Sequence, residues 1–199
     1  MTTALDVPAI YRPKHQQRLF RQFLDCMARP GSVADLAAWT GGAPAALAVL
    51  AALCDSEVLL ADPQRLLTGG DWDFLECRQS AVEEARFIFV DGTTAPDVGF
   101  EPALGTLTTP EQGATIVIRV SSLGTTGQLG TTGHKVRLSG PGIASQRELG
   151  LGTLHPGWLD QRAVWCRFFP LGVDLVVCDE SRVAALPRTT RVTQMGMHR

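Results

Sequence analysis

Hydrophobic side chains recur at helical spacing between residues 14 and 29. Those that share one face are Leu19, Phe20, Phe23, Leu24 and Met27. Polar residues occupy the opposite face, so the pattern predicts an amphipathic helix that packs on a core. Pro30-Gly31 is expected to end it, because neither residue favours a continuing helix.

A second helix is predicted over residues 44–54, which are apolar on all sides. Pro44 suits a first helical turn, because the N–H that proline lacks is not needed there. A helix without a polar face is expected to be buried. Two more helices are predicted, one over residues 71–79 with Asp71 as its N-cap and one over residues 158–168.

Short apolar runs rich in β-branched and aromatic residues predict strands between the helices. The runs lie at residues 57–61, 86–90, 115–120, 134–138, 173–178 and 182–186. The strands at 115–120 and 134–138 are predicted to pair as a hairpin. Helices and strands interleave along the chain, which is typical of an α/β layered domain with a mixed sheet.

The length and composition indicate one domain over residues 1–199, with loose termini at 1–13 and 193–199. The formal net charge is −2, so nothing in it favours nucleic acid or an anionic membrane as a partner. The longest apolar run, residues 43–54, is shorter than the roughly 20 residues that cross a bilayer. No apolar signal segment opens the chain, and a cytoplasmic protein is expected.

The spacing of cysteines and histidines does not predict a metal centre. The five cysteines are far apart and form no C-x-x-C motif, which argues against a disulfide framework and against a zinc or iron–sulfur site. The four histidines are isolated from one another in the sequence. No G-x-S-x-G segment marks a serine nucleophile, and no cofactor is expected.

Two glycine-rich motifs raise the question of phosphate binding. LGTTG occurs at residues 123–127 and again at 129–133, but it leads into a strand, whereas a phosphate loop opens a helix. Gly140-Pro141-Gly142 resembles half of a dinucleotide fingerprint, although the third glycine would fall on Ser145. A hairpin tip and a tight turn are favoured, and Gly140 and Gly142 are candidate ligand- or partner-binding residues.

Arg188-Thr189-Thr190-Arg191 follows the last predicted strand. Guanidinium forks and hydroxyls suit phosphate oxygens, so Arg188, Thr189 and Thr190 are further candidates for binding a ligand or partner. The alternative is a strand end whose arginines lie on the surface, and composition and spacing favour that alternative. The residues alone therefore indicate an α/β domain and name no reaction.

Longer segments carry a resemblance. The chain contains FPLGVDLVV at residues 169–177 and ALPRTTRV at 185–192. Ahead of them stand FRQFLDCMARPG at 20–31, LGTLTTPEQGATIVI at 104–118 and LSGPGI at 138–143. In this order the segments resemble the PhnH family, a subunit family of the bacterial carbon–phosphorus lyase system. The chain departs from that family at LECRQSAV, residues 75–82, where the family often carries an FHTGAP-like segment with a histidine.

The resemblance implies a three-layer α/β/α sandwich with a mixed β-sheet, similar to the fold of PLP-dependent transferases but without the cofactor. It implies a homodimer that assembles with the G, I and J subunits of the carbon–phosphorus lyase core complex. With partner subunits, the family is linked to forming α-D-ribose 1-methylphosphonate 5-triphosphate from ATP and methylphosphonate, with displacement of adenine. Because the chemistry is associated with the I and J subunits, a supporting role is predicted for this chain, with ATP or a phosphonate at shared sites.

Two other functions stay open at this point. The chain could be a domain that binds a nucleotide or a phosphonate by itself. A PLP-type enzyme is less favoured, because its Schiff base needs a lysine in a cofactor site. Lys14 lies before the first predicted helix and Lys135 lies in a predicted strand, and neither context suggests such a site.

Overall fold

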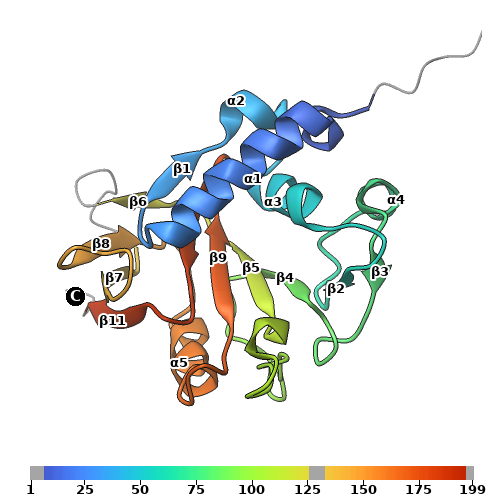
Figure 1. Cartoon of the computed structure of the whole chain (residues 1–199). Coiled ribbons are helices and arrows are strands. Elements are labelled where there is room, and N and C mark those ends of the chain that lie inside the picture. The colour runs from blue at the N-terminus through green and yellow to red at the C-terminus, as the bar shows by residue number, and fades with distance from the viewer. Residues whose placement is uncertain (1–6, 126–132, 196–199) are drawn as a thin grey trace, which may run out of the picture.

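Seven strands form a mixed sheet through the middle of the molecule, in the order β1-β10-β9-β5-β4-β2-β3 (Figure 1). The structure is a computed structural model and describes residues 7–125 and 133–195. The strands are β1 (Val33–Asp35), β2 (Leu59–Ala61), β3 (Arg78–Gln79), β4 (Phe87–Asp91), β5 (Thr115–Arg119), β9 (Asp174–Cys178) and β10 (Arg182–Leu186). β2, β3, β4, β5 and β9 pair in parallel, and β10 runs antiparallel to both of its neighbours.

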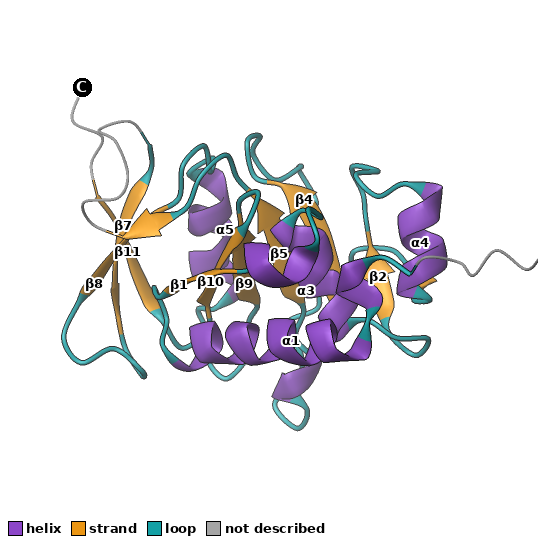
Figure 2. Cartoon of the chain, turned by 90° about the horizontal axis from the view of Figure 1, so that it is seen from above, coloured by secondary structure: helices purple, strands orange, loops and turns teal. Residues whose placement is uncertain are grey.

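Helices cover both faces of this sheet (Figure 2). On one face lie α1 (Pro13–Ala28) and α3 (Ala45–Leu53), in the same core as Phe87 and Phe89 of β4. On the other lies α5 (Gly157–Trp165), in the same core as Ile88. Because successive side chains of a strand point to opposite faces, a strand covered on both sides is apolar throughout. The uninterrupted apolar runs of the sequence are explained by this arrangement.

The helices α1 and α3 confirm two predicted helices, but Phe20 and Leu24, which were predicted on the packed face of α1, are exposed. The predicted N-cap of the third helix was wrong. The helix α4 spans Gly69–Leu75, and its N-cap is Thr68. The Thr68 hydroxyl accepts the N–H of Asp71 at 3.2 Å, and the Asp71 carboxylate accepts the N–H of Thr68 at 2.8 Å. Asp71 is therefore the third helical residue of a capping box. The remaining short elements are η1 (Ala9–Tyr11), α2 (Ala37–Thr40) and η2 (Pro110–Gln112).

A second sheet has four antiparallel strands in the order β11-β7-β8-β6. They are β6 (Gly124–Thr125), β7 (Lys135–Ser139), β8 (Arg147–Gly150) and β11 (Arg191–Met195). The predicted hairpin between residues 115–120 and 134–138 is wrong, because β5 pairs with β4 and β9 while β7 pairs with β8 and β11. The physical reason is burial: β5 is covered on both faces, whereas β7 alternates buried and exposed residues, as a strand with one solvated face does.

The ends of the chain hold more regular structure than the sequence indicated. η1 lies within the first predicted loose segment, and β11 extends to Met195 within the second. Of the repeated LGTTG motif, the structure describes only Leu123 to Thr125 and Gly133; the rest lies outside the described residues. No helix within residues 7–125 and 133–195 is both long and apolar enough to cross a membrane.

Candidate ligand-binding groove at the junction of the sheets

The segment Pro187 to Thr190 is the link by which the chain passes from the large sheet to the small one. β10 ends at Leu186 in the seven-stranded sheet, and β11 begins at Arg191 in the four-stranded sheet. Pro187 cannot donate to a strand ladder, which suits the end of β10. The N–H of Thr190 then donates to the Pro187 carbonyl at 2.8 Å and closes a tight turn. We call these four residues the PRTT junction.

Arg162 of α5 binds the backbone of the PRTT junction. Its Nη2 donates to the carbonyls of Pro187, at 2.6 Å, and Thr190, at 3.1 Å. Only 4% of the residue is exposed. Arg162 was not among the site residues predicted from the sequence, although it stands three residues after Leu159 and three before Trp165, on the apolar side of the helix. The signal that could have identified Arg162 was a single arginine on the apolar side of a predicted helix.

Arg188 is held by a carboxylate and by two loops. Its Nη2 donates to Oδ2 of Asp174 at 2.9 Å, and the two side chains are 12% and 15% exposed. Its Nη1 donates to the carbonyls of Pro110, at 2.6 Å, and Pro170, at 3.4 Å. With the Nε donation to Asp174, four of the five N–H groups of a guanidinium are occupied. The favoured surface location is thus wrong for Arg188 and correct for Arg191, which is exposed.

The two candidate glycines flank Pro141, and each lies close to the backbone of another segment. Gly140 has a φ of +127°, and a Cβ there would lie 3.0 Å from the carbonyl oxygen of Thr189. Gly142 has a φ of +80°, and a Cβ there would lie 2.2 Å from the carbonyl oxygen of Ala28 at the end of α1. Both positions favour glycine for its backbone freedom and its lack of a side chain.

A groove with a volume of about 600 Å³ runs along the PRTT junction, and we call it the PRTT groove. Arg188, Thr189 and Thr190 line it, as does Pro141 between the two glycines. The structure therefore brings the sequence-predicted candidates together, although Gly142 itself faces α1. The wall opposite the junction comes from α5 and the turn after it, and it contains both Arg162 and the exposed ring of Phe169.

The carboxyl ends of the parallel strands, where α/β sheets usually bind ligands, carry aspartates engaged in local contacts. Asp62 accepts the N–H groups of Leu66 and Leu67, at 2.9 and 2.8 Å. Asp91 pairs with Arg119 at 2.6 Å, and Asp179 pairs with Arg182 at 2.6 Å. In the described part of the chain, no group of acidic, histidine or cysteine side chains could hold a metal ion.

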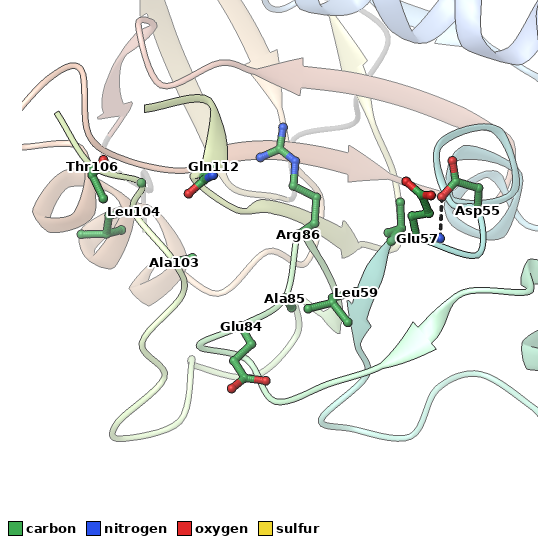
Figure 3. A pocket seen from close by; sticks show the side chains of 12 residues that line it. Asp55, Glu57, Leu59, Glu84, Ala85, Arg86, Ala103, Leu104, Thr106 and Gln112 are labelled. Carbon is green, nitrogen blue, oxygen red and sulfur yellow. Dashed lines mark hydrogen bonds between the residues drawn. The ribbon is translucent and has the colours of Figure 1, made fainter. Parts of the chain in front are cut away.

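A pocket of about 690 Å³ opens at the amino ends of β2 and β4 (Figure 3). Figure 3 shows Arg86 between Gln112 on one side and Asp55 and Glu57 on the other. Arg86 donates to the carbonyl of Gly113, and its burial lowers the pKa of its guanidinium. Glu84 also lines this pocket, so carboxylates outnumber cations there. The PRTT groove differs from this pocket, because none of the described residues that line it is a carboxylate.

Comparison with known proteins assigns this α/β domain to a family. Residues 10–193 match the family described as bacterial phosphonate metabolism protein (PhnH), and the chain belongs to that family. It is 41% identical, over 95% of its length and 91% of the relative's, to the "Putative C-P lyase subunit protein HtxG" of Stutzerimonas stutzeri. It is 32% identical, over 88% of its length and 89% of the relative's, to the "Alpha-D-ribose 1-methylphosphonate 5-triphosphate synthase subunit PhnH" of Rhizobium meliloti (strain 1021).

Proposed function

We propose that this chain is a supporting subunit of a cytoplasmic assembly that converts ATP and methylphosphonate into α-D-ribose 1-methylphosphonate 5-triphosphate, with release of adenine. The observation that carries the proposal is the family match over residues 10–193, together with two relatives whose names describe them as subunits. The partners we propose are the G, I and J subunits of the carbon–phosphorus lyase core complex. Together with these subunits, the chain would take part in the utilisation of organic phosphonates.

The arrangement of the lysines supports a role without Schiff-base chemistry. Lys14 lies exposed in the first turn of α1, and Lys135 lies exposed at the start of β7. A PLP enzyme needs its lysine inside the cofactor site. The likeness to PLP-dependent transferases is thus proposed for the layered fold alone, for which helices on both faces of a mixed sheet are a necessary feature.

Reconstitution tests the supporting role. The purified chain alone is expected to release no adenine from ATP plus methylphosphonate and to bind no PLP covalently. Added to its partner subunits, it is expected to be required for adenine release, measured by chromatography. Adenine release by the isolated, mass-verified chain, abolished by one substitution within it, would make this protein an enzyme in its own right. An assembly equally active without the chain would contradict the subunit role.

We propose that the chain self-associates through exposed apolar residues on and around α5, which we call the α5 face. Its members are Val98, Val164, Phe168 and Phe169, with 107%, 63%, 69% and 65% of each residue exposed. Exposed aromatic residues in one patch are typical of an interface rather than of free surface. Homodimers bury such patches on a twofold axis, with the same residues on both sides.

The charges around the α5 face favour a second copy as its occupant. On one side lies a hollow of about 650 Å³ lined by Glu83, Asp97 and Glu101 together with Val164. Beside Phe168 stands Arg167, whose guanidinium lies 5.4 Å from the ring centroid. A twofold axis through the strip would set the arginine of one copy against the acidic hollow of the other. This gives the interface opposite charges around an apolar centre.

We expect the wild-type chain to be a dimer by light scattering. The Phe168→Asp/Phe169→Asp variant should be a monomer, because dimerisation would bury two carboxylates from each copy without partners. Phe20→Asp, on the exposed side of α1, is the matched control and should remain dimeric. Arg167→Glu alone and Asp97→Arg/Glu101→Arg alone should dimerise poorly, whereas their mixture should form a heterodimer. A monomeric wild type, or charge variants that dimerise as the wild type does, would contradict the interface.

A further inference from the structure

Arg162 is a buried cation that forms no ion pair with the described residues. Its residue is 4% exposed, and both of its recorded hydrogen bonds go to backbone carbonyls. Its Nε has no hydrogen-bond partner among the described residues, and no carboxylate there lies at ion-pair distance. Burial lowers the pKa of its guanidinium, while Cys166 and Asp174 act in the opposite direction. A buried charge costs several kcal/mol unless a counter-charge offsets it.

Thr190 supplies a second observation at the same place. The residue is 2% exposed, and its hydroxyl has no partner among the described residues. Buried hydroxyls are nearly always hydrogen-bonded, because an unpaired one loses its contacts with water without replacement. Two unsatisfied polar groups thus belong to residues that line the PRTT groove.

The rest of the groove suits an anion with an organic part. Three arginines line it, namely Arg162, Arg188 and Arg191, and among the described residues only Arg188 has an ion pair, with Asp174. Thr189 and Arg191 are exposed at its mouth, where their donors can reach a ligand. Its volume of about 600 Å³ is far larger than a bare phosphate and falls within the range of small-molecule sites. Leu159, Phe169 and Val192 provide apolar wall.

We propose that the PRTT groove binds a tetrahedral phosphorus oxyanion, the phosphate or phosphonate group of a small organic molecule. Arg191 and Thr189 donate to its oxygens at the mouth, because guanidinium forks and hydroxyls match that geometry. The charge of the buried Arg162 attracts the anion through the protein interior, where electrostatic interactions are weakly screened. The hydroxyl of Thr190 donates to the anion after rotation of its side chain. The site goes beyond the proposed function, because a supporting subunit can assemble without binding any ligand.

The test is calorimetric titration of the isolated chain with inorganic phosphate, methylphosphonate and ATP, each in low-salt buffer. Saturable binding of at least one probe is expected. Equal binding of phosphate and methylphosphonate would assign recognition to the oxyanion, and preference for ATP would assign it to a nucleotide. Because no partner subunit is present, the result does not depend on whether the supporting role is correct.

Two variants separate this site from binding elsewhere. Arg191→Gln and Thr190→Val are each expected to weaken binding by about tenfold or more, the usual effect of losing a hydrogen bond to a charged group. Arg119→Gln, at the carboxyl end of β5, is the control and should change affinity by less than about twofold. Thr190→Val should leave the Tm unchanged or higher, because it replaces an unpaired buried hydroxyl by a methyl group. No saturable binding of any probe up to about 10 mM, or binding that both variants leave intact, would overturn the proposal.

Discussion

Replacing Arg188 by methionine is expected to lower the free energy of unfolding by about 3–5 kcal/mol. The side chain of Asp174 is only 15% exposed and faces the guanidinium at 2.9 Å, so its charge would remain buried without a partner. The carbonyls of Pro110 and Pro170 would lose their donor as well. For a chain of this length the Tm should fall by roughly 10 °C, which differential scanning calorimetry measures.

The exposed pair of Arg29 and Asp25 provides the control. It has a similar N–O distance, 3.1 Å, but its side chains are 61% and 59% exposed. Arg29→Met should cost less than about 1 kcal/mol. Asp174→Asn, combined with Arg188→Met, should recover much of the loss, because it removes the unpaired charge of the carboxylate. The asparagine side chain still provides an oxygen that accepts the backbone N–H of residue 188. A loss below about 1 kcal/mol for Arg188→Met would show that the pair does not stabilise the fold.

A role for Arg188 in complex assembly or nucleotide-dependent turnover stays a prediction. It can be separated from folding if the reconstituted complex is assayed well below the Tm of the variant. Wild-type assembly and turnover under those conditions would leave Arg188 with its structural contacts alone.

Replacing Gly142 by alanine is expected to destabilise the protein by about 2–5 kcal/mol. A φ of +80° costs an alanine about 1–2 kcal/mol. The added Cβ would also lie 2.2 Å from the carbonyl oxygen of Ala28, so the end of α1 or the turn must move. Overpacking of this kind costs roughly 1–3 kcal/mol more. Urea unfolding with an unchanged slope would measure the loss.

Gly99 isolates the two contributions. Its φ is +88°, close to that of Gly142, but a Cβ there would meet nothing within 4 Å. Gly99→Ala should therefore lose only the backbone part, about 1–2 kcal/mol. Equal losses for the two variants would mean that the approach of Gly142 to α1 is relieved without cost.

Local patterns predicted the parts of the fold that depend on local periodicity. The helix α1 and the uniformly apolar α3 were both placed from residue spacing, although spacing did not show that Phe20 and Leu24 of α1 are exposed. The buried runs of β4, β5 and β9 were placed in the same way. A strand or helix needs no distant partner to show its period, which explains why these elements were visible.

The pairing of the strands was not predictable from local patterns. Residues 134–138 were predicted as a strand, but nothing local identified β8 and β11 as the neighbours of β7. β11 carries too few apolar residues to be recognised as a strand without that pairing.

The sequence by itself determined that this chain forms a mixed α/β domain and, through ordered segments of resemblance, pointed to its family. It also singled out Arg188, Thr189 and Thr190 as unusual. Only the tertiary structure decided that these residues link two sheets, and that Arg188 meets Asp174 while Arg191 remains exposed. Only the tertiary structure showed that Arg162 binds the backbone of the junction, because Pro187 and Thr190 lie far from Arg162 along the chain. The free-energy cost of its buried charge depends on the groups that the fold places around it.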